Sequence, residues 1–238
     1  MLNFIYITAL LFLLMSIYIF LSYNQFVYYK DFGDKNSSIK ICLLAGVHGN
    51  EPAASILFQK FIDNDKFEEI ANEKNIFIRV IPSVNEFGLN FNTRYQNNLL
   101  YPDINRSFTE NGALHHISKD IIRLTMNMTL VIDFHEGWGF HKIDRESLGS
   151  SLTITGDKNI YYLSRKIIQR LNDTIPKNEH KFDILHRICD IKNTLSCYFH
   201  LNNKNYILVE TTGQNDIQPI SIRQMQIINI LDTVFAYF

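Results

Sequence analysis

Apolar runs of strand length alternate with amphipathic stretches of helix length along most of this chain. The strand-like runs are rich in Ile, Val and Leu, and they occupy residues 39–46, 75–85, 129–135 and 205–213. The helix-like stretches carry apolar residues at helical spacing, and they occupy residues 51–64, 112–128, 159–174 and 222–238. Strands of this composition, separated by helices, are typical of an α/β fold. The pattern predicts a mainly parallel sheet that is covered by helices on both faces.

The beginning of the chain breaks this alternation. Residues Leu2–Tyr23 carry no charged side chain, and the first charged residue is Lys30. A helix of this length would cross the hydrocarbon layer of a membrane, which is about 30 Å thick. The segment lacks the basic start and the small-residue exit of a cleavable signal peptide, so we expect a retained membrane anchor. Asp31 and Asp34 flank Lys30, which leaves the membrane face of the remaining chain open.

Three parts of the chain follow from these patterns. We expect a transmembrane anchor or signal segment at residues 1–23, a linker at 24–38 and one globular domain at 39–238. A domain of roughly 200 residues buries enough surface to fold without disulfides or a structural metal. The expected localisation is the membrane, through a single-pass N-terminal anchor, or outside the cell if the segment is cleaved.

Charge and cysteine content restrict the possible partners. The 238 residues have a formal net charge of -1, so no basic excess indicates a nucleic-acid partner. Three cysteines, an odd and sparse number, do not form a disulfide framework. We interpret Cys42 as a core residue of the first strand. Whether Cys189 and Cys197 pair is left open.

Residues whose side chains can bind a metal or transfer a proton lie at the ends of three of the predicted strands. His48 and Glu51 come after the first strand, His135 ends the third, and Glu210 lies at the end of the fourth. In open α/β sheets, ligands bind beyond the carboxyl ends of the strands. If these strands are parallel neighbours, the four side chains meet at one edge of the sheet.

Two imidazoles and one carboxylate form a good site for a divalent metal ion. His2Glu with one open position is a recurrent catalytic zinc set. The short spacing of His48 and Glu51 lets both reach one ion from a tight turn, and Gly46 and Gly49 permit that turn. His135 is the best-placed third ligand, and we therefore expect one Zn²⁺. Asp133 is a candidate hydrogen-bond partner for a ligand histidine.

The remaining candidate groups suit the hydrolysis of an amide. A carboxylate that is not a metal ligand can accept the proton of the attacking water, and Glu210 fits that role. The negative charge that develops on the attacked carbonyl also needs a cation. Arg94 and Arg106 are available for it.

Four motifs together resemble the zinc carboxypeptidase superfamily, and within it the succinylglutamate desuccinylase/aspartoacylase family. They are "GVHGNE", "DINRSF", "DFHEG" and "VETTG", and the resemblance extends over roughly Ile39 to Phe238. It implies a mixed, mostly parallel central sheet between helices. It also makes residues 39–238 a zinc carboxypeptidase/deacylase-like catalytic domain.

The resemblance also implies a role for each motif residue. His48, Glu51 and His135 match the zinc ligands of the family, and Glu210 matches its general base. Asn105 and Arg106 match the Asn-Arg pair that binds a substrate carboxylate. Arg94 is the counterpart of the arginine that polarises the scissile carbonyl. Deacylases of the family carry a further β-rich C-terminal domain that narrows the site. We do not expect this domain in the residues after Glu210, so the site should be more open than in those deacylases.

These observations favour a membrane-anchored zinc hydrolase that cleaves an amide bond next to a free carboxylate, as a carboxypeptidase does at a peptide C-terminus. One alternative is a deacylase of a small N-acyl amino acid. A second alternative is a catalytically inactive module that binds a carboxylate. Retention of both the metal set and Glu210 argues against the inactive module. The expected partners are therefore a small peptide or N-acyl amino acid and, through the N-terminal helix, a membrane.

Overall fold

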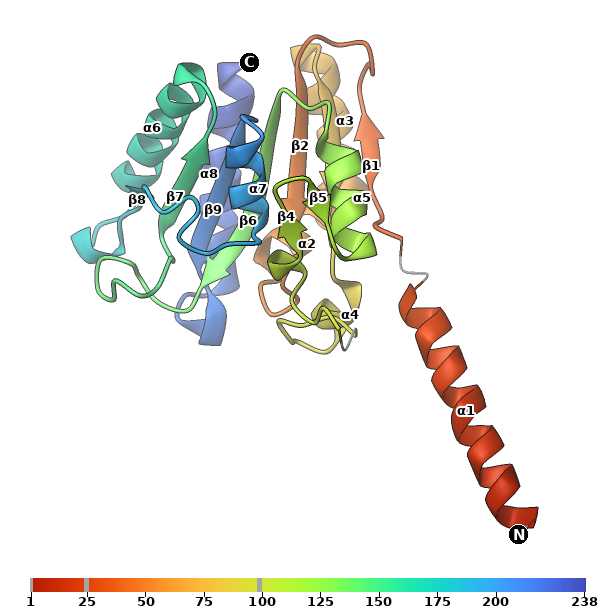
Figure 1. Ribbon diagram of the computed structural model, residues 1–238. Coiled ribbons are helices and arrows are strands. Elements are labelled where there is room, and N and C mark those ends of the chain that lie inside the picture. Colours follow the sequence, from red (N-terminus) through yellow and green to blue (C-terminus); the bar gives the residue numbers. More distant parts are fainter. Residues whose placement is uncertain (1, 24–25, 98–99) are drawn as a thin grey trace.

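The computed structural model describes residues 2–23, 26–97 and 100–238, and its centre is a mixed sheet (Figure 1). In the described part of the chain this sheet has seven strands in the order β1-β3-β2-β6-β9-β7-β8. The strands are β1 (Lys30–Phe32), β2 (Lys40–Ala45), β3 (Phe77–Ile81), β6 (Leu130–Gly137), β7 (Ser151–Thr155), β8 (Asp183–Leu185) and β9 (Tyr206–Thr212). A separate hairpin pairs β4 (Phe108–Thr109) with β5 (Gly112–Ala113).

The four central strands, β3, β2, β6 and β9, run parallel to one another. β1 pairs antiparallel with β3 at one edge, and β7 pairs antiparallel with β9 on the other side. In the β6–β9 ladder, His135 lies directly opposite Glu210. The carboxyl ends of β2, β6 and β9 therefore meet at the same edge of the sheet, as the sequence predicted.

Helices cover both faces of the sheet (Figure 1). Because alternate residues of a strand point to opposite faces, each central strand contributes to two separate apolar clusters. Ile132 and Val209 pack into the cluster of the first group of helices, whereas Val131 and Leu208 belong to the cluster on the opposite face. The first group is α2 (Ala53–Asp63), α3 (Lys66–Lys74), α6 (Lys158–Asp173) and α8 (Ile220–Tyr237), and the second is α5 (His116–Thr125) and α7 (Leu195–Leu201). The predicted mixed α/β architecture is confirmed.

Short helical segments complete the chain. They are α4 (Glu86–Asn90) and the 3-10 helices η1 (Ile104–Arg106), η2 (Asn178–His180) and η3 (Gln214–Asp216). η1 follows the loop that leads out of α4, and η3 follows β9 directly. Both lie beyond strand ends, where they contribute residues to the cavity described below.

The structure corrects the prediction of an N-terminal transmembrane helix. Residues Leu2–Tyr23 form the helix α1, which stands apart from the sheet in Figure 1. Crossing the hydrocarbon layer takes about 20 consecutive, predominantly apolar residues. Within the described residues, no helix combines the length and the apolar character that a membrane crossing needs. Residues 1, 24 and 25, which were assigned to the anchor and the linker, lie outside the described residues.

Some elements were not predicted because distant partners stabilise them. Lys30–Phe32, inside the range assigned to a linker, forms the edge strand β1, and Asp31 binds Arg79 of β3 with Oδ1–Nε and Oδ2–Nη2 distances of 2.7 and 2.8 Å. Ser151–Thr155 follows a Gly- and Ser-rich stretch that reads as a loop, yet it pairs with β9 along its whole length. Pairing with a partner that is distant in sequence leaves no local signal.

Candidate metal centre and active site

His48 and Glu51 lie in a tight turn after β2. Gly46 begins the turn with a φ of +66°, a left-handed conformation that favours glycine. A Cβ on Gly49 would overlap the backbone of Gly88, so this position also requires close backbone approach. The amide of Glu51 donates to the carbonyl of His48 at 3.3 Å, and Nδ1 of His48 lies 2.9 Å from Oε1 of Glu51. The turn thus presents both side chains at one point.

His135 joins this pair from β6. Its Nδ1 lies 3.1 Å from Nδ1 of His48 and 2.8 Å from Oε2 of Glu51, and all three side chains are buried. Donors bound to one tetrahedral zinc at about 2.0–2.1 Å lie roughly 3.3 Å from one another. The observed separations are close to this value, and the donor set is one that zinc prefers. The three residues therefore fit a single metal ion.

The outer nitrogens of both histidines bind carboxylates. Nε2 of His48 lies 3.3 Å from Oδ1 of Asp103, and Nε2 of His135 lies 3.2 Å from Oδ2 of Asp133. Tyr206 donates its hydroxyl to the same Asp133 oxygen at 2.8 Å. Carboxylates in this position fix the ring orientation and leave Nδ1 with its lone pair directed inward. This confirms that Asp133 and His135 project from the same face of their strand.

Two further donors hold the carboxylate of Glu51. The amide of Glu136 donates to Oε2 at 3.1 Å, and Nε2 of Gln214 donates to Oε1 at 2.8 Å. Burial alone would raise the pKa of Glu51, but His48 and His135 outweigh it and hold that pKa well below its usual range. The carboxylate is therefore in the ionised form that metal binding requires.

The metal-binding group forms one end of a cavity of about 400 Å³. The cavity brings together every residue that the sequence proposed for the site, which are His48, Glu51, Arg94, Asn105, Arg106, His135 and Glu210. Several residues between 187 and 196, in the β8–α7 connection and the start of α7, also line it. The volume lies within the range of small-molecule sites, about 300–1,000 Å³.

Residues 37–142 match the family model of the succinylglutamate desuccinylase/aspartoacylase catalytic domain. The resemblance predicted from the sequence is confirmed over these residues, which contain both histidines, Glu51 and the Asn105-Arg106 pair. The fourth motif, at residues 209–213, lies outside the matched range. No curated protein matches the chain significantly in sequence.

Solved structures share the fold at low sequence identity. The tripeptide-bound cell shape determinant Csd4 from Helicobacter pylori has a TM-score of 0.69 and 17% identity, with 88% of this chain and 54% of that chain covered. A candidate metallopeptidase from Shewanella denitrificans has a TM-score of 0.62 and 14% identity, with 90% and 80% covered. At these identities the likeness shows the fold alone. The chain spans about half the length of the Csd4 structures that it matches.

Glu210 lies beside the metal-binding group without being part of it. β9 places it opposite His135, and only 7% of the residue is exposed. Burial raises the pKa of Glu210 to about 8, an effect that His135 partly offsets. A metal cation at the adjacent donors would lower that pKa and favour the basic carboxylate.

Glu136, the next carboxylate along β6, is fully engaged elsewhere. Its Oε1 accepts from the amide of Ala53 at 2.7 Å, and its Oε2 accepts from Nη1 of Arg223 in a buried ion pair. The pair joins β6 to the first turns of α2 and α8. Glu136 therefore supports the site structurally, whereas, among the described residues, the carboxylate of Glu210 is not held in such an ion pair.

Asp103 connects the cationic groups to the metal-binding group. Nε and Nη2 of Arg94 each lie 3.0 Å from Oδ2 of Asp103, and Nη1 of Arg94 lies 3.8 Å from Oε1 of Glu51. The amide of Asn105 donates to the other Asp103 oxygen at 2.9 Å. Arg106 is more exposed, and its Nη1 donates to the carbonyl of Asn105 at 2.6 Å. Both arginines line the cavity.

Three supporting residues were missed in the sequence. Asp103 stands inside the "DINRSF" motif, and Gln214 directly follows "VETTG", so motif position was a usable signal for both. Arg223 had no such signal, because its partner Glu136 lies 87 residues away and the ion pair forms only when α8 packs on the sheet.

Proposed function

We propose that the protein is a zinc-dependent hydrolase that cleaves an amide bond next to a free carboxylate, with a peptide C-terminus as its substrate. The observation that carries the proposal is the position of Glu210. It lies beside three convergent metal donors without joining them, in a cavity that also holds Arg106 and Asn105. This arrangement supplies, in one cavity, a base for the attacking water and an anion site for the substrate carboxylate.

Each residue of the site has a separate role in the proposed reaction. A bound zinc ion would supply a Lewis acid and lower the pKa of its water toward about 7. Glu210 accepts the proton of the attacking water and returns it to the leaving nitrogen. Arg94 stabilises the negative charge that develops on the carbonyl oxygen. Arg106 and Asn105 bind the substrate carboxylate and so position the scissile bond.

The solved structures favour a peptide substrate. Csd4 is described as a D,L-carboxypeptidase and has been captured with a tripeptide, with a product and with mDAP. The second candidate, deacylation of an N-acyl amino acid, is favoured by the family match over residues 37–142. Both reactions use the same metal set, base and carboxylate site, and they differ in what lies on the acyl side of the scissile bond.

The test combines metal analysis with matched substrates. The purified full chain should contain one zinc ion per molecule and hydrolyse short peptides with a free C-terminal carboxylate faster than the same peptides with an amidated C-terminus. Faster cleavage of N-acyl amino acids would favour the deacylase instead. Binding of free-acid peptides with no turnover, in zinc-loaded protein, would identify the inactive carboxylate-binding module. A folded chain that retains no divalent metal after zinc is supplied would reject the proposal.

A further inference from the structure

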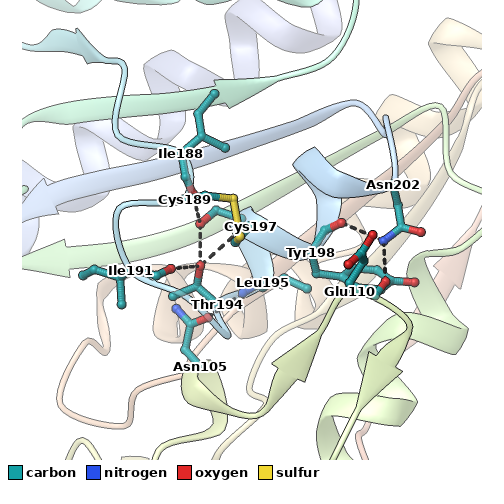
Figure 2. The surroundings of a disulfide bond; sticks show 11 residues. Asn105, Glu110, Ile188, Cys189, Ile191, Thr194, Leu195, Cys197, Tyr198 and Asn202 are labelled. Atoms are coloured by element: carbon teal, nitrogen blue, oxygen red, sulfur yellow. Dashed lines mark hydrogen bonds between the residues drawn. A yellow bond between two sulfur atoms is a disulfide. The ribbon is translucent and has the colours of Figure 1, made fainter.

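A disulfide between Cys189 and Cys197, drawn in Figure 2, closes a short segment of the chain. Residues of this segment line the cavity. The two cysteines are 8 residues apart, and the disulfide joins the middle of the β8–α7 connection to the first turn of α7. Four residues of this stretch line the cavity, which are Asp190, Ile191, Thr194 and Ser196. The segment thus faces the cavity and not the protein core alone.

Hydrogen bonds fix the shape of the closed segment. Thr194 caps α7, because its Oγ1 accepts from the amide of Cys197 at 3.2 Å. The same hydroxyl donates to the carbonyl of Ile191 at 3.1 Å. A short loop held by a covalent link and a helix cap has few alternative conformations. The amide of Leu195, the first residue of α7, is therefore held in one place.

That amide determines the orientation of Asn105. The Leu195 N–H donates to Oδ1 of Asn105 at 2.8 Å, and Figure 2 shows the Asn105 side chain directed at this helix start. Since the amide oxygen is occupied in this way, the NH2 group is the part of the side chain that remains for a ligand. Within the described part of the chain, the hydrogen bonds of Asn105 involve its backbone and its Oδ1, and none involves Nδ2. An NH2 group attracts a carboxylate, whereas an amide oxygen in its place would repel one.

We propose that the Cys189–Cys197 disulfide sets substrate selectivity by holding the Leu195 amide against Asn105, so that Asn105 presents its NH2 group to the substrate carboxylate. Leu195 and the disulfide are thus positioning elements that act through Asn105. This inference rests on the proposed function, because it needs a substrate that has a free carboxylate. It predicts that the disulfide affects the binding of free-acid substrates more than that of amidated ones.

The first experiment removes the disulfide. The Cys189→Ser/Cys197→Ser double variant, compared with the full-length wild type, should lose about 10-fold in the ratio of kcat/KM for free-acid over amidated peptide, the scale of one hydrogen bond to a charged group. The loss should lie mainly in KM. Cys42→Ala, which changes a buried cysteine of β2 outside the cavity, is the matched control and should keep the ratio.

A second pair of variants tests the Leu195 amide if the disulfide variant fails to fold. Leu195→Pro removes the N–H at the first helical position, where proline is tolerated. Thr194 already has the extended conformation (φ -93°, ψ 159°) that a following proline requires. Leu195→Ala truncates the same buried side chain but keeps the N–H. The proline variant should lower the free-acid preference about 10-fold, and the alanine variant should retain it.

A double-mutant cycle then separates positioning from general damage. In an Asn105→Ala background, removing the disulfide or the Leu195 N–H should change the preference less than about 2-fold, because both act through Asn105. An undiminished effect in that background would overturn the inference, as would full free-acid preference in the Leu195→Pro variant. A wild type with no free-acid preference would instead overturn the proposed function, so the two failures are distinguishable.

Discussion

The floor and the wall of the cavity are built in different ways. The floor consists of His48, Glu51, His135 and Glu210, which are buried and lie at the ends of neighbouring parallel strands. The wall consists of Asn105, Arg106 and the cavity-lining residues between 187 and 196. These residues lie in loops or in short helical segments. Sheet register fixes the floor, whereas the wall depends on one disulfide and a few hydrogen bonds. From this difference we expect that the proposed chemistry and the proposed selectivity can be changed separately by substitution.

The sharpest test of the floor is Glu210→Gln, which keeps the shape of the side chain and removes its basic site. We expect kcat to fall by about 10²–10⁴-fold, the scale of a lost general base, while zinc content stays at the wild-type value. Steady-state kinetics and elemental analysis measure both effects. Glu73→Gln, on the exposed side of α3, is the control. Loss of zinc would make Glu210 a ligand, and near-normal turnover would place the base elsewhere.

The corresponding test of the wall is Arg106→Ala. A guanidinium meets a carboxylate with two parallel charge-assisted hydrogen bonds, so its loss should lower kcat/KM for free-acid substrates by about 30- to 1000-fold. Amidated analogues should lose far less, and zinc content should not change. Arg165→Ala, an exposed arginine of α6, is the matched control. Equal losses on both kinds of substrate would remove Arg106 from the carboxylate site.

A smaller effect on the floor should come from Asp133→Asn. The amide can still accept from Tyr206, but it no longer provides the charge that orients His135 through Nε2. Removing such an outer carboxylate typically costs about 10- to 100-fold in metal affinity. Zinc competition titrations would measure it, with the exposed Asp173→Asn as control. Unchanged affinity would mean that strand register alone orients His135.

The smallest expected effect separates a structural histidine from the ligand histidines. His115 caps α5, where its Nδ1 accepts from the amide of Ile117 at 3.3 Å. His115→Ala should lower the free energy of unfolding by about 1 kcal/mol, the usual cost of a lost cap, without lowering zinc affinity. Denaturant unfolding measures the free energy of unfolding, and zinc titration measures the affinity for zinc. A loss of zinc in this variant would contradict the proposed ligand set.

The floor could be predicted from the sequence because its residues follow apolar strand runs and stand in motifs. His48, Glu51, His135 and Glu210 needed only the assumption of parallel neighbours, which the β2–β6–β9 order satisfies. The roles of these residues remain predictions until variants are measured.

The wall was less accessible to sequence reasoning. The bond between Leu195 and Asn105 joins residues 90 positions apart, and the pairing of Cys189 with Cys197 was left open. Gln214 reaches Glu51 across 163 residues. The prediction of an N-terminal transmembrane helix was wrong for a different reason. The absence of charged residues over a long run indicates an apolar composition, but it does not by itself establish a membrane crossing. Contacts between distant loops depend on the finished fold, so composition and periodicity do not reveal them.

The order of the central strands has a consequence for folding kinetics. The donors lie on β6 and after β2, and Glu210 lies on β9, so the site is complete only after segments spanning most of the chain have paired in register. Parallel pairing over such sequence separations is slow, because the entropy of loop closure is lost before the contacts form. Metal capture should therefore follow the rate-limiting step. Zinc would then slow unfolding strongly while leaving the refolding rate nearly unchanged, as expected for interactions absent from the transition state.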